Sequence, residues 1–233
     1  MKRLAIFVEG QTEQLFVRRL LCEIAGERNI SITELKSRMS KKGNRSFTVI
    51  NATSDSPSAK YYVLIYDSGS DSQVKSDIVD NYDNLARSEY EKIIGLRDVY
   101  PVNIAEIDKL EMGLKYGVKT KPIPVNIILA VMEIEAWFLG EITHFTKIHS
   151  ALTLDRITQL LNFDPTQHDV ESRACPSADL HSIYQLEGFA YTKKRSNCLR
   201  TVNALDCNVM YLSLSQTIKS MGYFIKEIDA FFS

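Results

Sequence analysis

The sequence predicts an α/β protein whose parallel-rich sheet is covered by helices on both faces. Two observations carry this prediction. Segments typical of strands and of helices alternate over the first 140 residues, and several of the strands are continuous apolar runs. Such runs are typical of strands that are buried on both faces. Of the 233 residues, 45% are hydrophobic and 24% charged, so the chain can bury a sizeable core.

The expected elements follow in order along this first part. Helices are expected at 13–28, 72–90 and 103–117, because apolar residues recur there at helical spacing, and Thr12 is the expected N-cap of the first helix. The expected strands cover 3–9, 47–50, 60–67, 92–98 and 125–132, and the last one leads into a helix near Glu133 or Glu135.

After residue 140 the pattern becomes mainly helical. Helical spacing recurs over 152–163 and 214–232, and a turn-rich loop at 164–180 lies between these segments. We therefore expect an α/β domain over residues 1–140 and a helical extension or cap over residues 141–233.

The charge balance limits the classes of partner. The net charge is −1, so the chain has no overall basic field for nucleic acid, and binding of that kind would need a local patch. One basic triplet lies late in the chain, in "YTKKRSN". The densest basic cluster of the first half comprises Lys36, Arg38, Lys41, Lys42 and Arg45.

The cysteines and the apolar runs indicate the compartment. Cys22, Cys175, Cys198 and Cys207 have no spacing typical of a zinc site, and they are expected to be reduced thiols of a cytoplasmic protein. No apolar run approaches the roughly 20 residues of a membrane-spanning helix, so no membrane partner is expected.

Carboxylates stand where the predicted strands end. Glu9, Asp67 and Asp98 each close a strand, and Glu133 and Glu135 follow the last one. In an open α/β sheet, ligands bind outside the carboxyl ends of the strands. Carboxylates that crowd together repel unless a cation lies between them, and oxygen-only ligands favour Mg²⁺ or Mn²⁺. The pattern therefore indicates a divalent-metal site with phosphoryl-transfer or phosphodiester chemistry.

Each carboxylate also has a structural alternative. Glu9 is favourable near a helix N-terminus without any catalytic role. Asp67 in "DSGSD" is typical of a turn residue that bonds its own backbone, and Asp98 before "VYP" is similar. Only one of Glu133 and Glu135 can face a site if that segment is extended, because they flank a single residue.

The stretch "VEGQTEQLFV", with acids at later strand ends, resembles the TOPRIM domain of topoisomerases, primases and OLD-family nucleases. Glu9 and Gly10 match the first TOPRIM motif. "EGQTE", "EIEAWFLGE" and "YTKKRSN" also resemble the DUF4276 group of bacterial proteins. The resemblance covers residues 1–140 and extends weakly to the rest, and it implies a TOPRIM-like, Rossmann-like sheet.

The second TOPRIM motif, Asp-x-Asp, is incomplete. After Asp98 the second position is Tyr100, and after Asp67 it is Gly69, with Asp71 two residues further on. We favour Asp98 as the first motif Asp, and Asp67 is the alternative. The protein then holds one metal ion, takes Glu133 or Glu135 for a second, or binds without cutting.

The resemblance also implies residue roles. Glu9 would act as general base or bridging metal ligand, and Asp98 would hold Mg²⁺ with Asp67 or Asp71. Glu133 or Glu135 would complete the metal's ligands. A basic triplet beside an aromatic residue suits a patch that follows a phosphate backbone, although such triplets are more often solvated helix faces. The candidate phosphate contacts are Lys193, Lys194 and Arg195.

Three functions follow from these patterns. The first is a Mg²⁺-dependent nuclease or phosphodiesterase, for which the resemblance implies a setting in bacterial defence. The second is a non-catalytic module on a TOPRIM-like scaffold that binds nucleic acid or protein. The third is a subunit that works only beside a partner ATPase. The substrate stays open among DNA, RNA and small phosphoesters, and a homo-oligomer is compatible with the sequence.

Overall fold

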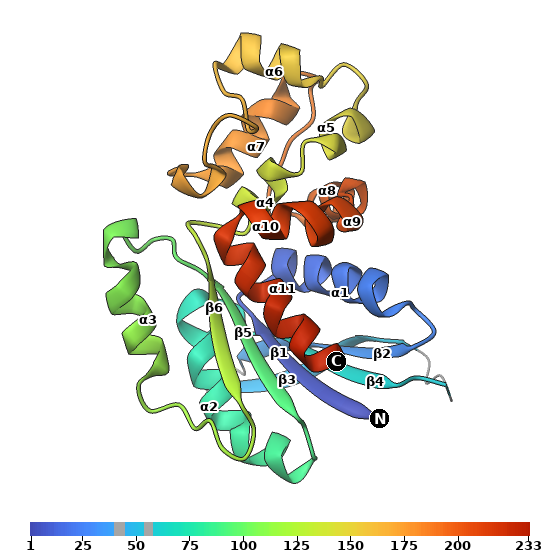
Figure 1. Cartoon of the computed structure of the whole chain (residues 1–233), viewed down its shortest axis with the longest axis vertical. Coiled ribbons are helices and arrows are strands. Elements are labelled where there is room, and N and C mark those ends of the chain that lie inside the picture. Colours follow the sequence, from blue (N-terminus) through green and yellow to red (C-terminus); the bar gives the residue numbers. More distant parts are fainter. Residues whose placement is uncertain (40–44, 54–57) are drawn as a thin grey trace. The chain divides into compact units, whose positions relative to one another are not determined.

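A computed structural model describes residues 1–39, 45–53 and 58–233, and it confirms the α/β class (Figure 1). The described strands form one six-stranded sheet in the order β3-β2-β4-β1-β5-β6. These strands are β1 Lys2–Val8, β2 Ile30–Met39, β3 Arg45–Ala52, β4 Tyr61–Asp67, β5 Lys92–Asp98 and β6 Val125–Ala130.

Most of the sheet is parallel. β1 pairs in parallel with β4 and with β5, and β2 pairs in parallel with β4. The bonds from Ile93 N to Pro124 O and from Val99 N to Ala130 O advance in the same direction along β5 and β6, as parallel strands require. β3 is antiparallel to β2 and lies at one edge. Parallel order brings the carboxyl ends of the central strands to one edge of the sheet.

Helices follow the strands and cover both faces, as the sequence predicted (Figure 1). α1 Gln11–Ala25 follows β1, and α2 Asp71–Arg87 follows β4. Alternate residues of a strand point to opposite faces, and Phe7 of β1 lies in a core cluster with Val74 and Ile78 of α2. β5 leads through the short η1 Ile104–Glu106 and α3 Ile107–Lys115 to β6.

The second half is mainly helical, as predicted. The contacts divide the chain into two compact units. Unit 1 comprises 1–97, 108–129 and 226–233, and unit 2 comprises 98–107 and 130–225. The expected division into residues 1–140 and 141–233 stays a prediction, because a grouping of contacts does not show which part folds alone. The elements that follow β6 are α4 Glu135–Gly140, α5 Thr143–Ile148, α6 Leu154–Leu161, η2 Val170–Ser172, α7 Pro176–Gln185, α8 Arg195–Ala204, α9 Cys207–Val209, the π-helix η3 Met210–Leu214, α10 Ser215–Thr217 and α11 Lys219–Phe232.

Several local details differ from the expectations. β2 was not predicted, because its apolar–polar alternation breaks at a register shift between Glu34 and Leu35, in a segment that also contains helix-forming residues. The N-cap of α1 is Gly10 rather than Thr12, which lies buried inside the first turn. The helix expected over 214–232 is interrupted at Ile218, where the backbone is extended. Lys41 and Lys42 of the basic cluster lie outside the described residues.

In the described ranges, no helix combines the length and the apolar character that crossing a membrane requires.

Candidate functional site

The carboxyl edge of unit 1 is organised around the end of β4. The strand register places Asp67 beside Val8 of β1 and beside Lys36 of β2. The Ser68 amide donates to the Val8 carbonyl at 2.9 Å, which extends the β1–β4 pairing by one step. Glu9 therefore follows β1 at the level where β4 ends.

Asp67 is a buried carboxylate with incomplete charge compensation. Its side chain is 3% exposed, and its Oδ2 lies 3.5 Å from Lys36 Nζ. The Gly69 amide donates to Oδ1 at 2.9 Å, which is the turn contact considered for Asp67 in "DSGSD". Burial raises the pKa of Asp67, although Lys36 and the Gly69 amide oppose that rise. A buried carboxylate of this kind is stabilised by an added cation.

Asp71 is the first residue of α2, and it pairs with a cation that the sequence patterns did not single out. Arg97 of β5 places its Nη2 atom 3.1 Å from Asp71 Oδ2, and the Arg97 side chain is 7% exposed. The β1–β5 register pairs Val8 with Leu96, so Arg97 follows at the level of Glu9. The edge thus combines carboxylates with cations.

Arg45 is a third cation on the same side of unit 1, after Lys36 and Arg97. Its guanidinium donates to Asp77 Oδ1 at 2.5 Å, to the Gln73 side chain and to the Ser68 carbonyl. It also lies over the ring of Phe47, 5.7 Å from the centroid. Membership of the basic cluster was the sequence signal for Arg45, but nothing in the sequence indicated its partners.

In unit 2, Asp98 and Glu133 both contact the beginnings of helices. Asp98 Oδ1 accepts the Ile134 amide at 2.9 Å, at the N-cap of α4. Glu133 accepts the Ser177 amide at 2.8 Å and the Ser177 hydroxyl at 3.0 Å, within the first turn of α7. Carboxylates are favourable in such positions because unpaired amides point at them. Their predicted metal roles stay predictions.

Glu135 has a different environment from its neighbour Glu133. It is fully buried, and its Oε1 lies 2.6 Å from the Tyr191 hydroxyl and 2.5 Å from Lys193 Nζ. Its Oε2 has no hydrogen-bond partner among the described residues. Lys193, Lys194 and Arg195 are all exposed near the start of α8, and Lys193 also forms an ion pair with the buried Glu135 carboxylate.

The predicted site residues thus fall in two sets. Glu9, Asp67 and Asp71 belong to unit 1, and all of the others belong to unit 2. Across 1–39, 45–53 and 58–233, no three His, Cys, Asp or Glu side chains gather as a metal site. A closed cage of protein ligands is therefore not what the described residues offer. Asp67 fits Mg²⁺ or Mn²⁺ better as one of few protein ligands, because Mg²⁺ usually keeps several waters and adds substrate phosphates.

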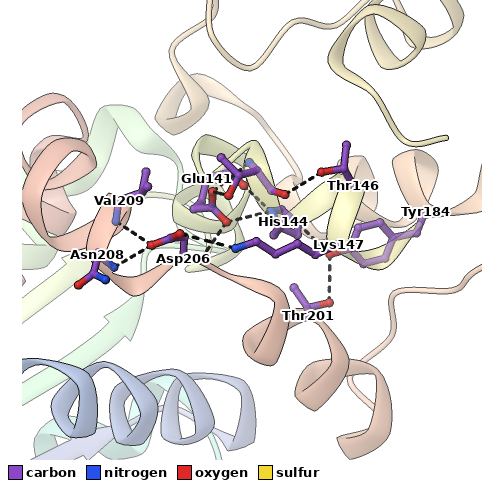
Figure 2. Close-up of polar contacts among 10 residues, drawn as sticks. Glu141, His144, Thr146, Lys147, Tyr184, Thr201, Asp206, Asn208 and Val209 are labelled. Carbon is purple, nitrogen blue, oxygen red and sulfur yellow. Dashed lines mark hydrogen bonds and ion pairs between the residues drawn. The ribbon is translucent and has the colours of Figure 1, made fainter. Parts of the chain in front are cut away.

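A buried polar network in unit 2 was missed by the sequence reasoning (Figure 2). His144 Nε2 lies 2.9 Å from the Tyr184 hydroxyl, which in turn lies 3.1 Å from Thr201 Oγ1. His144 Nδ1 faces the Glu141 carbonyl, and the Glu141 carboxylate accepts the Asp206 amide at 3.1 Å. Burial lowers the pKa of His144 to about 4. Residues 141 and 144 are close in sequence, but Tyr184 and Thr201 are not, so no short motif indicates the network.

Comparison with known proteins adds a family match over most of the chain. The family described as "Domain of unknown function (DUF4276)" matches residues 8–198. No curated protein matches. A solved structure of a candidate cell surface hydrolase from Lactobacillus plantarum WCFS1 is similar with 14% identity and a TM-score of 0.33, over 63% of this chain and 57% of that one. The chain thus spans little more than half of that structure, and a likeness of this size carries no argument about function.

Proposed function

This chain belongs to the DUF4276 family, and we propose that it cleaves phosphodiester bonds at the carboxyl edge of its sheet, with a divalent cation held at Asp67. The observation that carries the proposal is the environment of Asp67. Its carboxylate is buried at a strand end, and its nearest cation is the half-exposed Lys36 at 3.5 Å. Charge-assisted hydrogen bonds are usually about 2.7–2.9 Å long, so this contact leaves the carboxylate incompletely compensated.

The side chains at this edge offer the type of metal ligand that supports binding of a hard divalent cation. Glu9, Asp67 and Asp71 supply oxygen atoms only, which is the ligand set that Mg²⁺ and Mn²⁺ prefer. When bound, such a cation would lower the pKa of a coordinated water and neutralise phosphate charge. Asp67 would hold it, and Glu9 would accept a proton from the attacking water as general base.

The cations of the edge support a phosphate-bearing substrate. Lys36 has a side chain that is 45% exposed and can contact a phosphate at the end of β2. Arg97 is almost buried, and its Nη2 atom lies 3.1 Å from Asp71 Oδ2. We therefore propose that Arg97 compensates the charge of Asp71 and does not contact the substrate. Mixed carboxylates and cations at a strand edge suit a reaction in which phosphate charge must be held while water is activated.

The wider setting is part of the same proposal. We propose that the sheet is related to the TOPRIM domain, that the protein works in the bacterial cytoplasm in a defence role, and that it acts on nucleic acid, either alone, as a homo-oligomer or beside a partner ATPase. Exposed Lys194 and Arg195 at the start of α8, together with Lys193, would add contacts to the phosphate backbone.

The test is a cleavage assay with purified protein and Mg²⁺ or Mn²⁺. The substrates are supercoiled plasmid, single-stranded DNA, RNA and bis(para-nitrophenyl) phosphate. Asp67→Asn and Glu9→Gln should each lower the rate by about 100-fold or more, while thermal melts show folded protein. The matched control is Asp83→Asn, an acid on α2 that is 70% exposed and paired with Lys119. Equal rates in wild type and both site variants, or no cleavage of any substrate by wild type, would refute the proposal.

The variant Asp98→Asn tests whether Asp98 or Asp67 is the metal-binding Asp of the second TOPRIM motif. Asp98 accepts the Ile134 amide, and Asn keeps an oxygen that can do the same, so Asp98→Asn is expected to stay folded with a nearly unchanged rate. A folded Asp98→Asn protein without activity would transfer the metal role to Asp98.

One observation favours a second candidate, a non-catalytic module that binds nucleic acid or protein. Asp67, Asp71 and Glu135 each have a Lys or Arg within ion-pair distance. A carboxylate that is paired in this way is available to a metal ion only if its partner moves. This candidate predicts salt-sensitive binding of single-stranded nucleic acid, or binding of a protein, that survives Glu9→Gln and needs no divalent cation.

A further inference from the structure

Unit 2 contains a pocket that no step of the proposed cleavage uses. Its volume is about 350 Å³, which lies within the usual range for small-molecule sites. The lining comes from the end of α4 and the turn after it, from the segment that leads into η2, and from the segment that runs from α9 to just beyond α10. We propose that this pocket binds a small ligand with an apolar ring and an amino group, through hydrogen bonds that the ligand donates.

The inner lining is apolar and held firmly. Pro165, Val170 and Ile218 line the pocket and are buried. Gly140 lets Ile218 approach closely, because a Cβ at position 140 would lie 2.6 Å from Ile218 Cδ1. Aliphatic walls of this kind accept the face of a ring and provide binding free energy through burial of apolar surface.

The backbone around the pocket is unusual. Val209 and Leu214 line it, Val209 directly before the π-helix η3 Met210–Leu214 and Leu214 as the last residue of that helix. π-helical segments are rare, and they occur often at functional sites. Here the π-helix brings two aliphatic side chains to the same pocket.

The threonine hydroxyls that line the pocket each donate their hydrogen to another group of the protein. Thr166 Oγ1 donates to Asp164 Oδ1 at 2.7 Å, and Thr217 Oγ1 donates to the Leu214 carbonyl at 3.2 Å. A hydroxyl has one hydrogen and two lone pairs, so each of these groups offers a ligand an acceptor.

The two ionisable side chains of the lining, His168 and Asp169, also offer hydrogen-bond acceptors to a ligand. His168 Nδ1 lies 2.8 Å from the Asp164 carbonyl, so in the neutral form of the ring Nδ1 carries the hydrogen and Nε2 is an acceptor. The Asp169 carboxylate accepts the Glu171 amide at 2.9 Å and carries a negative charge. The polar side chains of the lining therefore favour a ligand that donates, and Asp169 favours one that is positively charged.

The test compares two probes with the same ring and opposite charge, tryptamine and indole-3-propionate. Each is titrated into the full-length, isotope-labelled protein, and amide chemical shifts are recorded. We expect saturable binding of tryptamine, with shifts at the lining residues, at least tenfold tighter than binding of indole-3-propionate. Val209→Trp, which fills the pocket, should abolish binding, and Asp169→Asn, which keeps the capping oxygen, should weaken it several-fold.

The control is Leu212→Ala, because Leu212 is 66% exposed in the same π-helix and does not line the pocket. It should leave tryptamine binding unchanged. Equal affinity for tryptamine and indole-3-propionate would overturn the proposal that the ligand must donate hydrogen bonds. Absence of saturable binding, or binding that Val209→Trp leaves intact in folded protein, would overturn the site itself. These readouts do not depend on phosphodiester cleavage.

Discussion

The Nε2 atom of His144 lies 2.9 Å from the hydroxyl oxygen of Tyr184, and neither side chain is exposed to solvent (Figure 2). On the other side of the ring, Nδ1 faces the carbonyl of Glu141. A carbonyl only accepts, so the neutral ring carries its hydrogen on Nδ1 and accepts the Tyr184 hydroxyl at Nε2. Protonation of Nε2 would break that arrangement in a site that water does not reach.

The first prediction concerns the pH dependence of stability. Burial lowers the folded-state pKa of His144 to about 4, from an ordinary value of 6.5. Between these two values the unfolded state binds the proton and the folded state does not, so stability falls as pH falls through that window. The slope contributed by His144 is about 1.4 kcal/mol per pH unit.

Urea unfolding at a series of pH values measures this slope. His144→Gln should remove it, and His168→Gln, at an exposed histidine, should retain it. The same slope in wild type and His144→Gln would show that other groups cause the pH dependence.

A second prediction tests the Tyr184 hydroxyl. Tyr184→Phe leaves buried His144 Nε2 without its donor and Thr201 without a partner, at a cost of about 1–3 kcal/mol in the free energy of unfolding. Tyr116→Phe is the matched change at a side chain that is 83% exposed, and it should stay within about 0.5 kcal/mol. Chemical denaturation of the two variants measures both changes in the free energy of unfolding. Equal midpoints would mean that the Tyr184 hydroxyl is not part of a stabilising network.

The third prediction concerns Glu135 and Lys193. Lys193→Met should destabilise the protein by about 1–3 kcal/mol, because it leaves a fully buried carboxylate with only the Tyr191 hydroxyl near it. Lys194→Met, one residue later on the exposed start of α8, should cost less than about 0.5 kcal/mol. In a double-mutant cycle, Lys193→Met should cost much less when Glu135 is already Gln. Additive effects would exclude a direct interaction between the two side chains.

A fourth prediction follows from Asp67. Without divalent cations, Asp67→Asn should leave the melting temperature unchanged or raise it, because it removes a buried charge that Lys36 compensates only at 3.5 Å. Mn²⁺ should raise the melting temperature of wild type and not that of Asp67→Asn. Calorimetric titration of Mn²⁺ gives the same comparison directly. A variant that Mn²⁺ stabilises as much as wild type would place the ion elsewhere.

The strands with strong apolar runs could be predicted from the sequence, whereas β2 could not. β1 and β4 are continuous runs because both faces of the central sheet are covered, and each run stops where the strand ends. β2 begins with alternating apolar and polar residues, but a register shift between Glu34 and Leu35 breaks that pattern, and β2 pairs with β3, the edge strand. A segment such as "ISITELKS" has no continuous run to mark it, and its Glu, Leu and Lys residues also suit a helix.

The positions of the candidate acids were predictable, but their partners were not. A run of apolar residues fixes where Asp67 and Asp98 end their strands. Pairing depends on which segments meet after folding, and Glu135 meets Lys193 across 58 residues of sequence. His144 gave no signal at all, because a lone histidine beside apolar residues is the same in sequence whether it is buried or exposed.

The fifth prediction compares two glycines that sit in helices. Gly222 lies in α11, and a Cβ there would collide with the backbone carbonyl oxygen of Ser215, so Gly222→Ala should cost about 1–3 kcal/mol through overpacking. Gly113 lies inside α3, where a Cβ would meet nothing within 4 Å. Gly113→Ala should stabilise the protein by about 0.5–1 kcal/mol, because alanine loses less conformational freedom in a helix. Urea unfolding of both variants should therefore shift the midpoint in opposite directions. A shift of the same sign for both would show that the close approach of residues 222 and 215 does not limit the packing there.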